Sequence, residues 1–244
     1  MSTDEHASTL WQVSAFDRLH EQAMKGTDRP TIISSTLMAE IAALEKRNDE
    51  NDALEVLATC VRLQEPALVY LRFAELVWPV TVFPVQMIYH APRPLTEAPE
   101  SSLARVTSMA IEPAVVRPPG HAMSNRVAAA DSYYSLAPAL WRLALFGPRG
   151  RLLNEIGGTA AYRVLRNPRV DDLPLPGALG PAAERLRREP ASLKQIAGWP
   201  GMSLERAARL LNALYLASNL MVSRTAVAAQ AEPRRGLFGW LGAR

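Results

Sequence analysis

The chain has little of what covalent cross-linking and metal chemistry need. Among its 244 residues there is one cysteine, Cys60, which excludes an intrachain disulfide and a multi-cysteine zinc site. The four histidines stand far apart and lack the H-E-x-x-H and H-x-E spacings of zinc enzymes. The glycine-rich motifs GxGxxG, Walker A and GxSxG are also missing. We therefore expect no metal, no organic cofactor and no enzymatic activity.

Long apolar runs are scarce as well. The most apolar stretch, 68–88, contains Arg72, Glu75, Pro79 and Pro84, whereas a membrane span needs about 20 largely uninterrupted apolar residues. The first six residues, Met-Ser-Thr-Asp-Glu-His, do not have the basic and apolar segments of a signal peptide. With its single thiol, this pattern predicts a cytoplasmic protein without a transmembrane segment.

Charge is divided unevenly along the chain. Residues 1–100 carry 8 Lys and Arg against 15 Asp and Glu, whereas residues 101–244 carry 19 against 9. Such a split indicates two units with different surroundings. The basic half could face nucleic acid, an acidic protein or anionic lipid, and the alternative is that the two halves attract one another.

Periodicity and breakers predict an α+β fold that is mostly helical. Residues 1–120 are expected to form an acidic, α-rich N-terminal domain, with helices over 9–24, 34–45, 53–64 and 66–77. Strands are expected near 80–116, where β-branched and aromatic residues gather. Residues 126–224 form a basic region, with a helix over 136–146.

The stretch Ser192–Arg224 has the order short helix, tight turn, longer helix, strand. Ser192 and Gln195 have the spacing of a capping box, and Ser203 can cap the second helix. Gly198, Pro200 and Gly201 break the chain between the two helices. An apolar face recurs at helical spacing along the second helix, and Asn219 is expected to take the left-handed conformation after it.

This pattern resembles the winged-helix superfamily. The resemblance rests on core and turn positions: Leu193, Ile196-Ala197, Gly201, Ser203, Leu211, Leu214 and Leu220-Met221-Val222. With a helix over 181–189 in front, it covers a unit of residues 181–224, about the last quarter of the chain. The resemblance implies the fold, and modules of this kind bind nucleic acid or other proteins without chemistry of their own.

Two functions follow from the resemblance, and they differ in the partner. A DNA-binding transcriptional regulator would present polar and basic side chains at the start of its recognition helix. A signalling or scaffolding adaptor would use the same helix against a protein, and the apolar residues on more than one side of this helix favour the adaptor. The candidate contacts for either partner are Ser203, Glu205, Arg206, Arg209 and Asn212.

The last segment, 225–244, is predicted to be a tether with a docking tail. An eight-residue, alanine-rich tether, Thr225–Glu232, precedes two arginines and four large apolar side chains. The tail resembles short terminal peptides with which some bacterial cytoplasmic proteins dock onto partners or membranes. We expect it to bind a protein or a membrane surface through Arg234, Arg235, Leu237, Phe238, Trp240 and Leu241.

Overall fold

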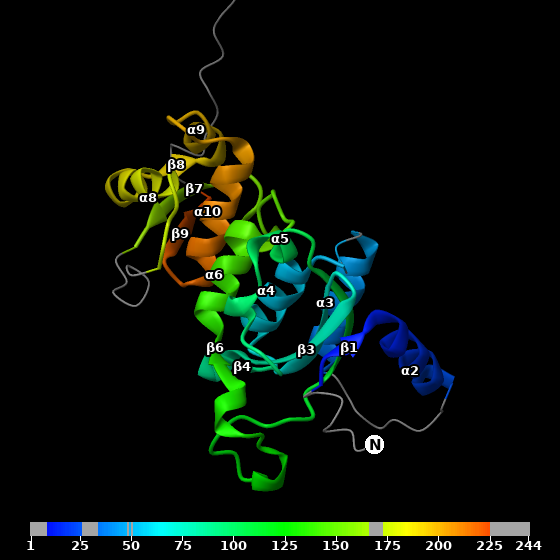
Figure 1. Ribbon diagram of the computed structural model, residues 1–244. Coiled ribbons are helices and arrows are strands. Elements are labelled where there is room, and N and C mark those ends of the chain that lie inside the picture. Colours follow the sequence, from blue (N-terminus) through cyan, green and yellow to red (C-terminus); the bar gives the residue numbers. More distant parts are fainter. Residues whose placement is uncertain (1–8, 26–33, 48, 50, 166–172, 225–244) are drawn as a thin grey trace, which may run out of the picture.

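The computed structural model describes residues 9–25, 34–47, 49, 51–165 and 173–224. Within these ranges the chain has an α+β fold, with a six-stranded antiparallel sheet and a smaller three-stranded sheet (Figure 1). None of the helices in the described ranges is long and apolar enough to cross a membrane. The tether and tail predicted over 225–244 lie outside the described residues.

The larger sheet has the strand order β5-β2-β3-β4-β6, and β1 pairs with the start of β3. Its central hairpin turns at Ala74, which has a left-handed φ of 54°. The strands are β1 (Trp11–Gln12), β2 (Ala67–Phe73), β3 (Leu76–Phe83), β4 (Ile88–His90), β5 (Thr107–Pro113) and β6 (Tyr133–Ser135). Because β6 pairs with β4, this sheet takes strands from both sides of the boundary predicted near residue 120. The two-domain division stays a prediction.

The helix predicted over 66–77 is wrong, because this stretch forms β2 and the beginning of β3. Val69 and Leu71 belong to the main core, whereas Leu68 and Tyr70 pack in a second cluster on the opposite side. A strand that is buried on both faces reads as a continuous apolar run, which periodicity alone does not distinguish from a buried helix. The long strands of this sheet therefore begin at residue 67 and not near residue 80.

Helices cover both faces of the larger sheet. On one face, α4 (Ala53–Leu63) and α6 (Leu136–Phe146) pack on the strands, and α3 (Ser35–Lys46) packs on α4. On the other face lies α2 (Val13–Lys25), where the rings of Phe16 and Tyr70 have their centroids 4.7 Å apart. Ser34 and Asp52 cap α3 and α4 with their side-chain oxygens. The short helices are η1 (Pro84–Gln86), η2 (Leu95–Glu97), α5 (Glu100–Leu103), η3 (Ser124–Arg126), η4 (Ala130–Ser132) and η5 (Asn154–Ile156).

The last quarter of the chain has the predicted order of helices. α9 (Leu193–Ala197) begins with the predicted capping box of Ser192 and Gln195, and Ser203 accepts a hydrogen bond from Arg206 N at the start of α10 (Leu204–Leu216). These parts of the prediction are confirmed. The prediction for Asn219 is wrong, since Ser218 takes the left-handed conformation, with φ of 57°, and Asn219 is buried.

The smaller sheet includes a strand that lies upstream of the predicted unit. Its order is β8-β7-β9, where β8 is Ala191–Ser192, β9 is Leu220–Ser223 and the central β7 is Ala161–Val164. Both pairings are antiparallel. β7 precedes α8 (Leu179–Arg188), so the sheet needs residues before position 181. No strand follows β9 within the described residues.

α6 and α10 join the two parts of the molecule. They lie side by side between the two sheets (Figure 1), and α10 contacts α6 along its length. Leu140 and Leu143 of α6 and Leu211 and Leu214 of α10 belong to one continuous apolar core. The candidate contact helix is therefore part of the interior of the protein.

Candidate functional site

Three of the five candidate contact residues lie at the start of α10, where they are exposed to solvent. Ser203, Glu205 and Arg206 are exposed, and Leu204 between them is 58% exposed. Arg206 donates from Nη1 to the carbonyl oxygen of Gly201 at 2.6 Å. This short turn therefore offers a hydroxyl, a carboxylate, a guanidinium and an apolar side chain on one exposed surface.

Arg209 and Asn212 point from α10 towards the rest of the molecule. Arg209 donates from Nη1 to Leu145 O in the last turn of α6 at 2.7 Å, and its Nη2 lies 2.9 Å from Glu205 Oε1. A cation suits that place because the unpaired carbonyls at the end of a helix carry partial negative charge. The side chain of Asn212 is fully buried, so its contacts are with groups inside the protein.

Asn212 holds the loop that follows α6. Its Oδ1 accepts a hydrogen bond from Leu153 N, and its Nδ2 donates to Arg151 O, both at 2.9 Å. A buried asparagine that pairs two backbone groups removes the cost of leaving them unsatisfied. Binding of a partner by the predicted set stays a prediction. Four of its five residues reach solvent, and the exception is Asn212.

A buried ionic joint, defined here as Asp49, Asp52, Glu55 and Arg149, was not found by sequence reasoning. Arg149 Nη1 lies 2.6 Å from Asp52 Oδ2, and its Nη2 lies 2.7 Å from Glu55 Oε2. Only 1% of the Arg149 side chain is exposed. Arg149 also donates to Leu152 O at 2.5 Å, so it connects the start of α4 with the loop after α6.

Asp49 extends the ionic joint to the next turn of the same loop. It forms an ion pair with Arg151 and accepts a hydrogen bond from Asn154 Nδ2 at 3.1 Å. Burial raises the pKa of Glu55 above its usual value, and the neighbouring Arg149 guanidinium opposes that rise. The uneven division of charge along the sequence was the only signal of this joint, and these pairs are attractions between the acidic and the basic part of the chain.

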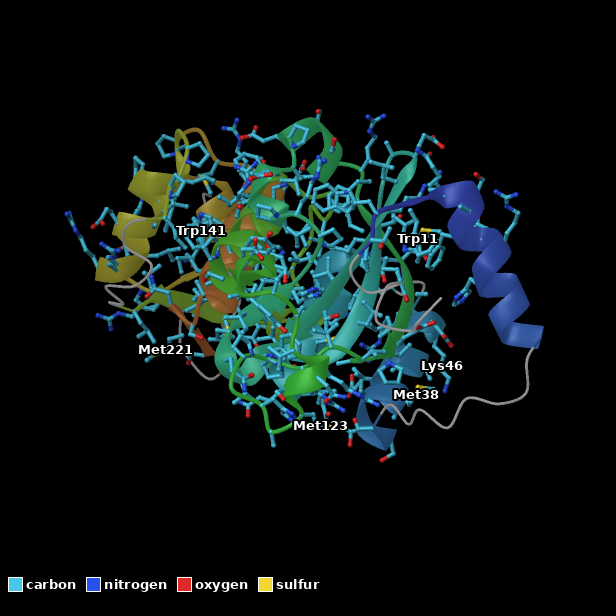
Figure 2. All side chains as sticks on the ribbon, turned by 60° about the horizontal axis from the view of Figure 1, so that its bottom comes forward. Trp11, Met38, Lys46, Met123, Trp141 and Met221 are labelled. Carbon is cyan, nitrogen blue, oxygen red and sulfur yellow. The ribbon has the colours of Figure 1, made fainter. Side chains whose placement is uncertain are left out.

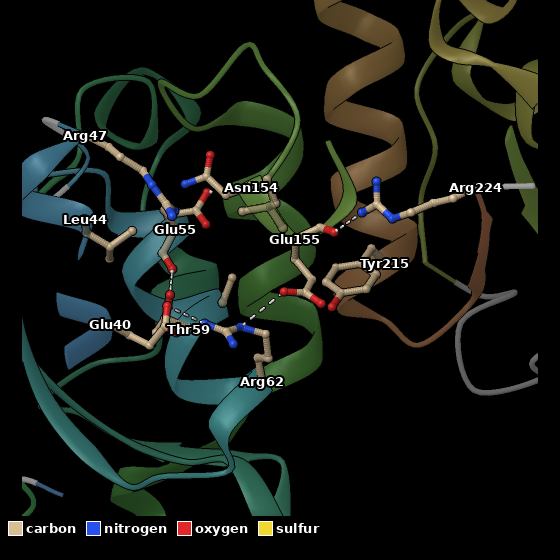
Figure 3. A pocket seen from close by; sticks show the side chains of 12 residues that line it. Glu40, Leu44, Arg47, Glu55, Thr59, Arg62, Asn154, Glu155, Tyr215 and Arg224 are labelled. Atoms are coloured by element: carbon tan, nitrogen blue, oxygen red, sulfur yellow. Dashed lines mark hydrogen bonds and ion pairs between the residues drawn. The ribbon is translucent and has the colours of Figure 1, made fainter. Parts of the chain in front are cut away.

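A polar cavity of 360 Å³ lies beside the ionic joint. Figure 3 shows Arg62 of α4 between two carboxylates, with Glu40 Oε2 at 2.8 Å and Glu155 Oε2 at 3.4 Å. Arg224, at the end of β9, donates to the carbonyl oxygens of Gly157 and Glu155, both at 2.8 Å. The charged lining residues are balanced, with three carboxylates and three guanidiniums: Glu40, Glu55, Glu155, Arg47, Arg62 and Arg224.

An apolar groove of 310 Å³ adjoins this polar cavity. It lies between α4 and the turn from α10 to β9, and the two spaces share Ala58, Arg62 and Tyr215. The apolar groove is defined here by its lining, Ala58, Val61, Arg62, Tyr215, Leu216, Ser218 and Leu220. A third cavity, of 390 Å³, lies at the other end of α10, beside Leu145, Leu179 and Arg206.

Two residues with reactive side chains, Cys60 and His90, are buried. Cys60 is buried, and burial raises the pKa of its thiol to about 12, so it is not a thiolate at neutral pH. His90 is 1% exposed and packs on Tyr133, with ring centroids 5.4 Å apart. Trp78, Phe83 and Tyr89 are buried core residues. In the described ranges, no group of three or more His, Cys, Asp and Glu is arranged to hold a metal ion.

Comparisons with protein-family models, with curated proteins and with solved structures found no match to this chain.

Proposed function

We propose that this protein is a non-enzymatic, cytoplasmic signalling or scaffolding adaptor, which binds proteins through a winged-helix-like unit and a C-terminal peptide. The winged-helix interpretation is supported by the succession α8, β8, α9, α10 and β9, and by the small antiparallel sheet beside them. The strand that pairs with β8 and β9 is β7, which comes from the part of the chain before this unit.

The burial of α10 is the observation that favours a protein partner over a DNA partner. Eight of its thirteen residues are buried, and its length packs on α6. A recognition helix has to enter a major groove about 12 Å wide with one side free of its own protein. Here the side that carries Arg209 and Asn212 is occupied by α6 and the loop after it.

The exposed first turn of α10 suits a protein surface. Leu204 is the largest apolar side chain on this turn, and the third cavity lies beside Ser203 and Arg206. Interfaces gain affinity from an apolar anchor surrounded by polar groups that set the register. We assign Leu204 the anchoring role, with Ser203, Glu205 and Arg206 as its polar surroundings.

Affinity capture with matched variants tests this role. Leu204→Asp should lose the proteins that the full chain retains, whereas Val85→Asp, at a 68% exposed position in η1, should retain them. Both substitutions add the same charge at a solvent-exposed site, so folding is not the difference between them. Equal capture by the two variants would remove Leu204 from the interaction.

The alternative function is a winged-helix DNA-binding regulator, favoured by the exposed Arg206 and by the basic last turn of α8, with Arg185, Arg187 and Arg188. Binding to duplex DNA, titrated with salt, separates the two functions. A DNA-binding protein loses affinity steeply as salt rises, and Arg206→Ala with Arg209→Ala should flatten that slope. Steep, arginine-dependent binding would replace the adaptor proposal, and no binding in 50 mM salt is what we expect.

The C-terminal peptide is the second element of the proposal. A chain ending at Glu232 should keep the fold and lose an interaction, because the removed residues hold four large apolar side chains beside Arg234 and Arg235. Anionic vesicles test the membrane surface as the target of the peptide. A blue shift of Trp240 emission on vesicles would identify lipid, and identical partners for both chain lengths would contradict a docking role.

A further inference from the structure

The apolar groove lies where the described chain ends. β9 ends at Ser223, and Arg224 lines the polar cavity that shares Ala58, Arg62 and Tyr215 with the groove. Leu220 of β9 forms part of the groove itself. The segment that follows Arg224 therefore starts beside the polar cavity, which adjoins the apolar groove on the surface of the same chain.

The chemistry of the groove suits an aromatic side chain. Val61, Tyr215 and Leu220 are partly exposed in its walls, and Ala58 and Leu216 are buried in them. Its 310 Å³ has room for one large ring with part of a neighbouring side chain. Phe238 and Trp240, with Leu237 and Leu241, are the apolar residues of the segment.

The length of the segment permits this contact. The twelve residues 225–236 separate Arg224 from Leu237, and a fully extended chain of that length spans about 40 Å. A flexible chain of that length has an average end-to-end distance of roughly 20 Å, which gives an effective concentration on the order of 1 mM. A contact that is weak between separate molecules, with Kd on the order of 0.1–1 mM, is then largely formed within one chain.

We propose that residues 233–244 dock in cis into the apolar groove between α4 and the α10–β9 turn, with the aromatic pair Phe238 and Trp240 as the anchor. Partner and groove then compete for one peptide, so the contact is autoinhibitory. The autoinhibitory role rests on the proposed docking function of the C-terminal peptide, whereas the contact in cis does not depend on whether the first turn of α10 binds protein or DNA.

Apolar contact, and not charge, should dominate the docking. The adjoining polar cavity has equal numbers of carboxylates and guanidiniums, so it offers Arg234 and Arg235 little net attraction. Replacing both arginines by Ala should change the docked fraction less than about threefold, and 0.5 M salt should leave it in place. Docking on anionic lipid would instead depend strongly on both.

Other exposed apolar positions are less suited to receive the aromatic anchor than the apolar groove is. Figure 2 shows Met38 and Met221 at opposite sides of the molecule, and with Met123 they are 42–50% exposed. None of these three methionines lines the polar cavity, the apolar groove or the third cavity. The third cavity lies at the far end of α10, about 20 Å along a helix of thirteen residues from the α10–β9 turn.

A spin label on the segment tests the proposal in the full-length chain. Ala243→Cys places the label near the end, and Cys60 does not react because it is buried. We expect selective broadening of the amide resonances of Val61, Tyr215 and Leu220 at 50 µM protein. Phe238→Ser with Trp240→Ser should abolish this broadening, whereas Arg234→Ala with Arg235→Ala should keep it.

A groove variant and a mixing experiment complete the test. Val61→Lys should abolish the broadening, and the control Val85→Lys, in η1, should keep it; if Val61→Lys does not fold, the double serine variant decides. When spin-labelled chain is mixed with isotope-labelled chain that has no spin label, the resonances of the isotope-labelled chain should show no broadening. Broadening of the spin-free chain in that mixture means docking on a second copy, and broadening at Leu145 and Leu179 means the third cavity; either result, or none at Val61, overturns the proposal.

Discussion

Arg149 Nη2 and Glu55 Oε2 form an ion pair of 2.7 Å between side chains that are 1% and 6% exposed. A second carboxylate, Asp52, contacts the other end of the same guanidinium at 2.6 Å. The pair joins the start of α4 to the loop after α6, and that loop is held from its other side by Asn212 of α10. The two parts of the molecule are thus connected by charge as well as by the α6–α10 core.

Arg149→Met should lower the free energy of unfolding by about 3–5 kcal/mol, because it leaves buried carboxylates without their cation. Arg151→Met is the matched control and should cost about 1 kcal/mol or less, since the Arg151 side chain is 63% exposed and Asn154 still binds Asp49. Urea unfolding of both variants measures the difference. Equal losses would show that burial of Arg149 does not matter.

Leu211→Asp should unfold the last quarter of the chain, because Leu211 is 0% exposed and the new carboxylate would be buried without a partner. We expect a loss of at least ~3 kcal/mol. Leu204→Asp, on the same helix at 58% exposure, should stay within about 0.5 kcal/mol of the natural chain. Thermal melts followed by circular dichroism compare the two, and an unchanged melting temperature for Leu211→Asp would contradict the assigned face of α10.

Asn212→Ala should cost about 2–4 kcal/mol, because Leu153 N and Arg151 O both lose their buried partner. Ser203→Ala removes a single cap at the exposed start of the same helix and should cost about 1 kcal/mol. Amide hydrogen exchange adds a local measurement, since Leu153 N should exchange faster in the first variant only. Retained protection of Leu153 would mean that another group holds the loop.

The free energy of unfolding should decrease as the pH is lowered, because of His90. Burial lowers the pKa of His90 to about 4 from an ordinary value of 6.5. Between these two values the unfolded chain binds a proton that the folded chain does not, so stability decreases as the pH falls through this window. At pH 5 the loss is about 2 kcal/mol relative to pH 7.5.

The variant His90→Gln isolates this contribution from that of Glu55, whose raised pKa acts in the opposite direction. The variant is expected to be less stable at pH 7.5, because its packing on Tyr133 is lost, and to lose about 2 kcal/mol less on acidification. Urea midpoints at pH 7.5, 6 and 5 give the two profiles. Parallel profiles would show that His90 is protonated in the folded protein.

Features that depend on neighbouring residues were predictable from the sequence. The capping box of Ser192 and Gln195 needs only a hydroxyl and an amide three positions apart, and the helix over 136–146 needs only its breaker Gly147-Pro148. The strand β2 was not predictable, because burial on both faces removes the alternation that identifies a strand. Its position was determined by pairing with β3 and β5.

The site was less predictable than the fold. Arg149 and Asp52 are 97 residues apart in the sequence, and no spacing rule connects them. Ser203 and Arg206 were identified as exposed because capping and helical period fix the first turn of α10. Asn212 was grouped with them by the same period, but its side chain meets a loop whose place depends on the whole fold.

The central position of β7 has a consequence for how the chain can be divided. Among the described residues, β8 and β9 do not pair with each other, and the strand partner of each is β7. A chain cut between Val164 and Leu179 would give two fragments, of which the first carries the strand that the second lacks. Mixed together, the fragments should reassemble by strand complementation, and a synthetic peptide of β7 should compete with that reassembly.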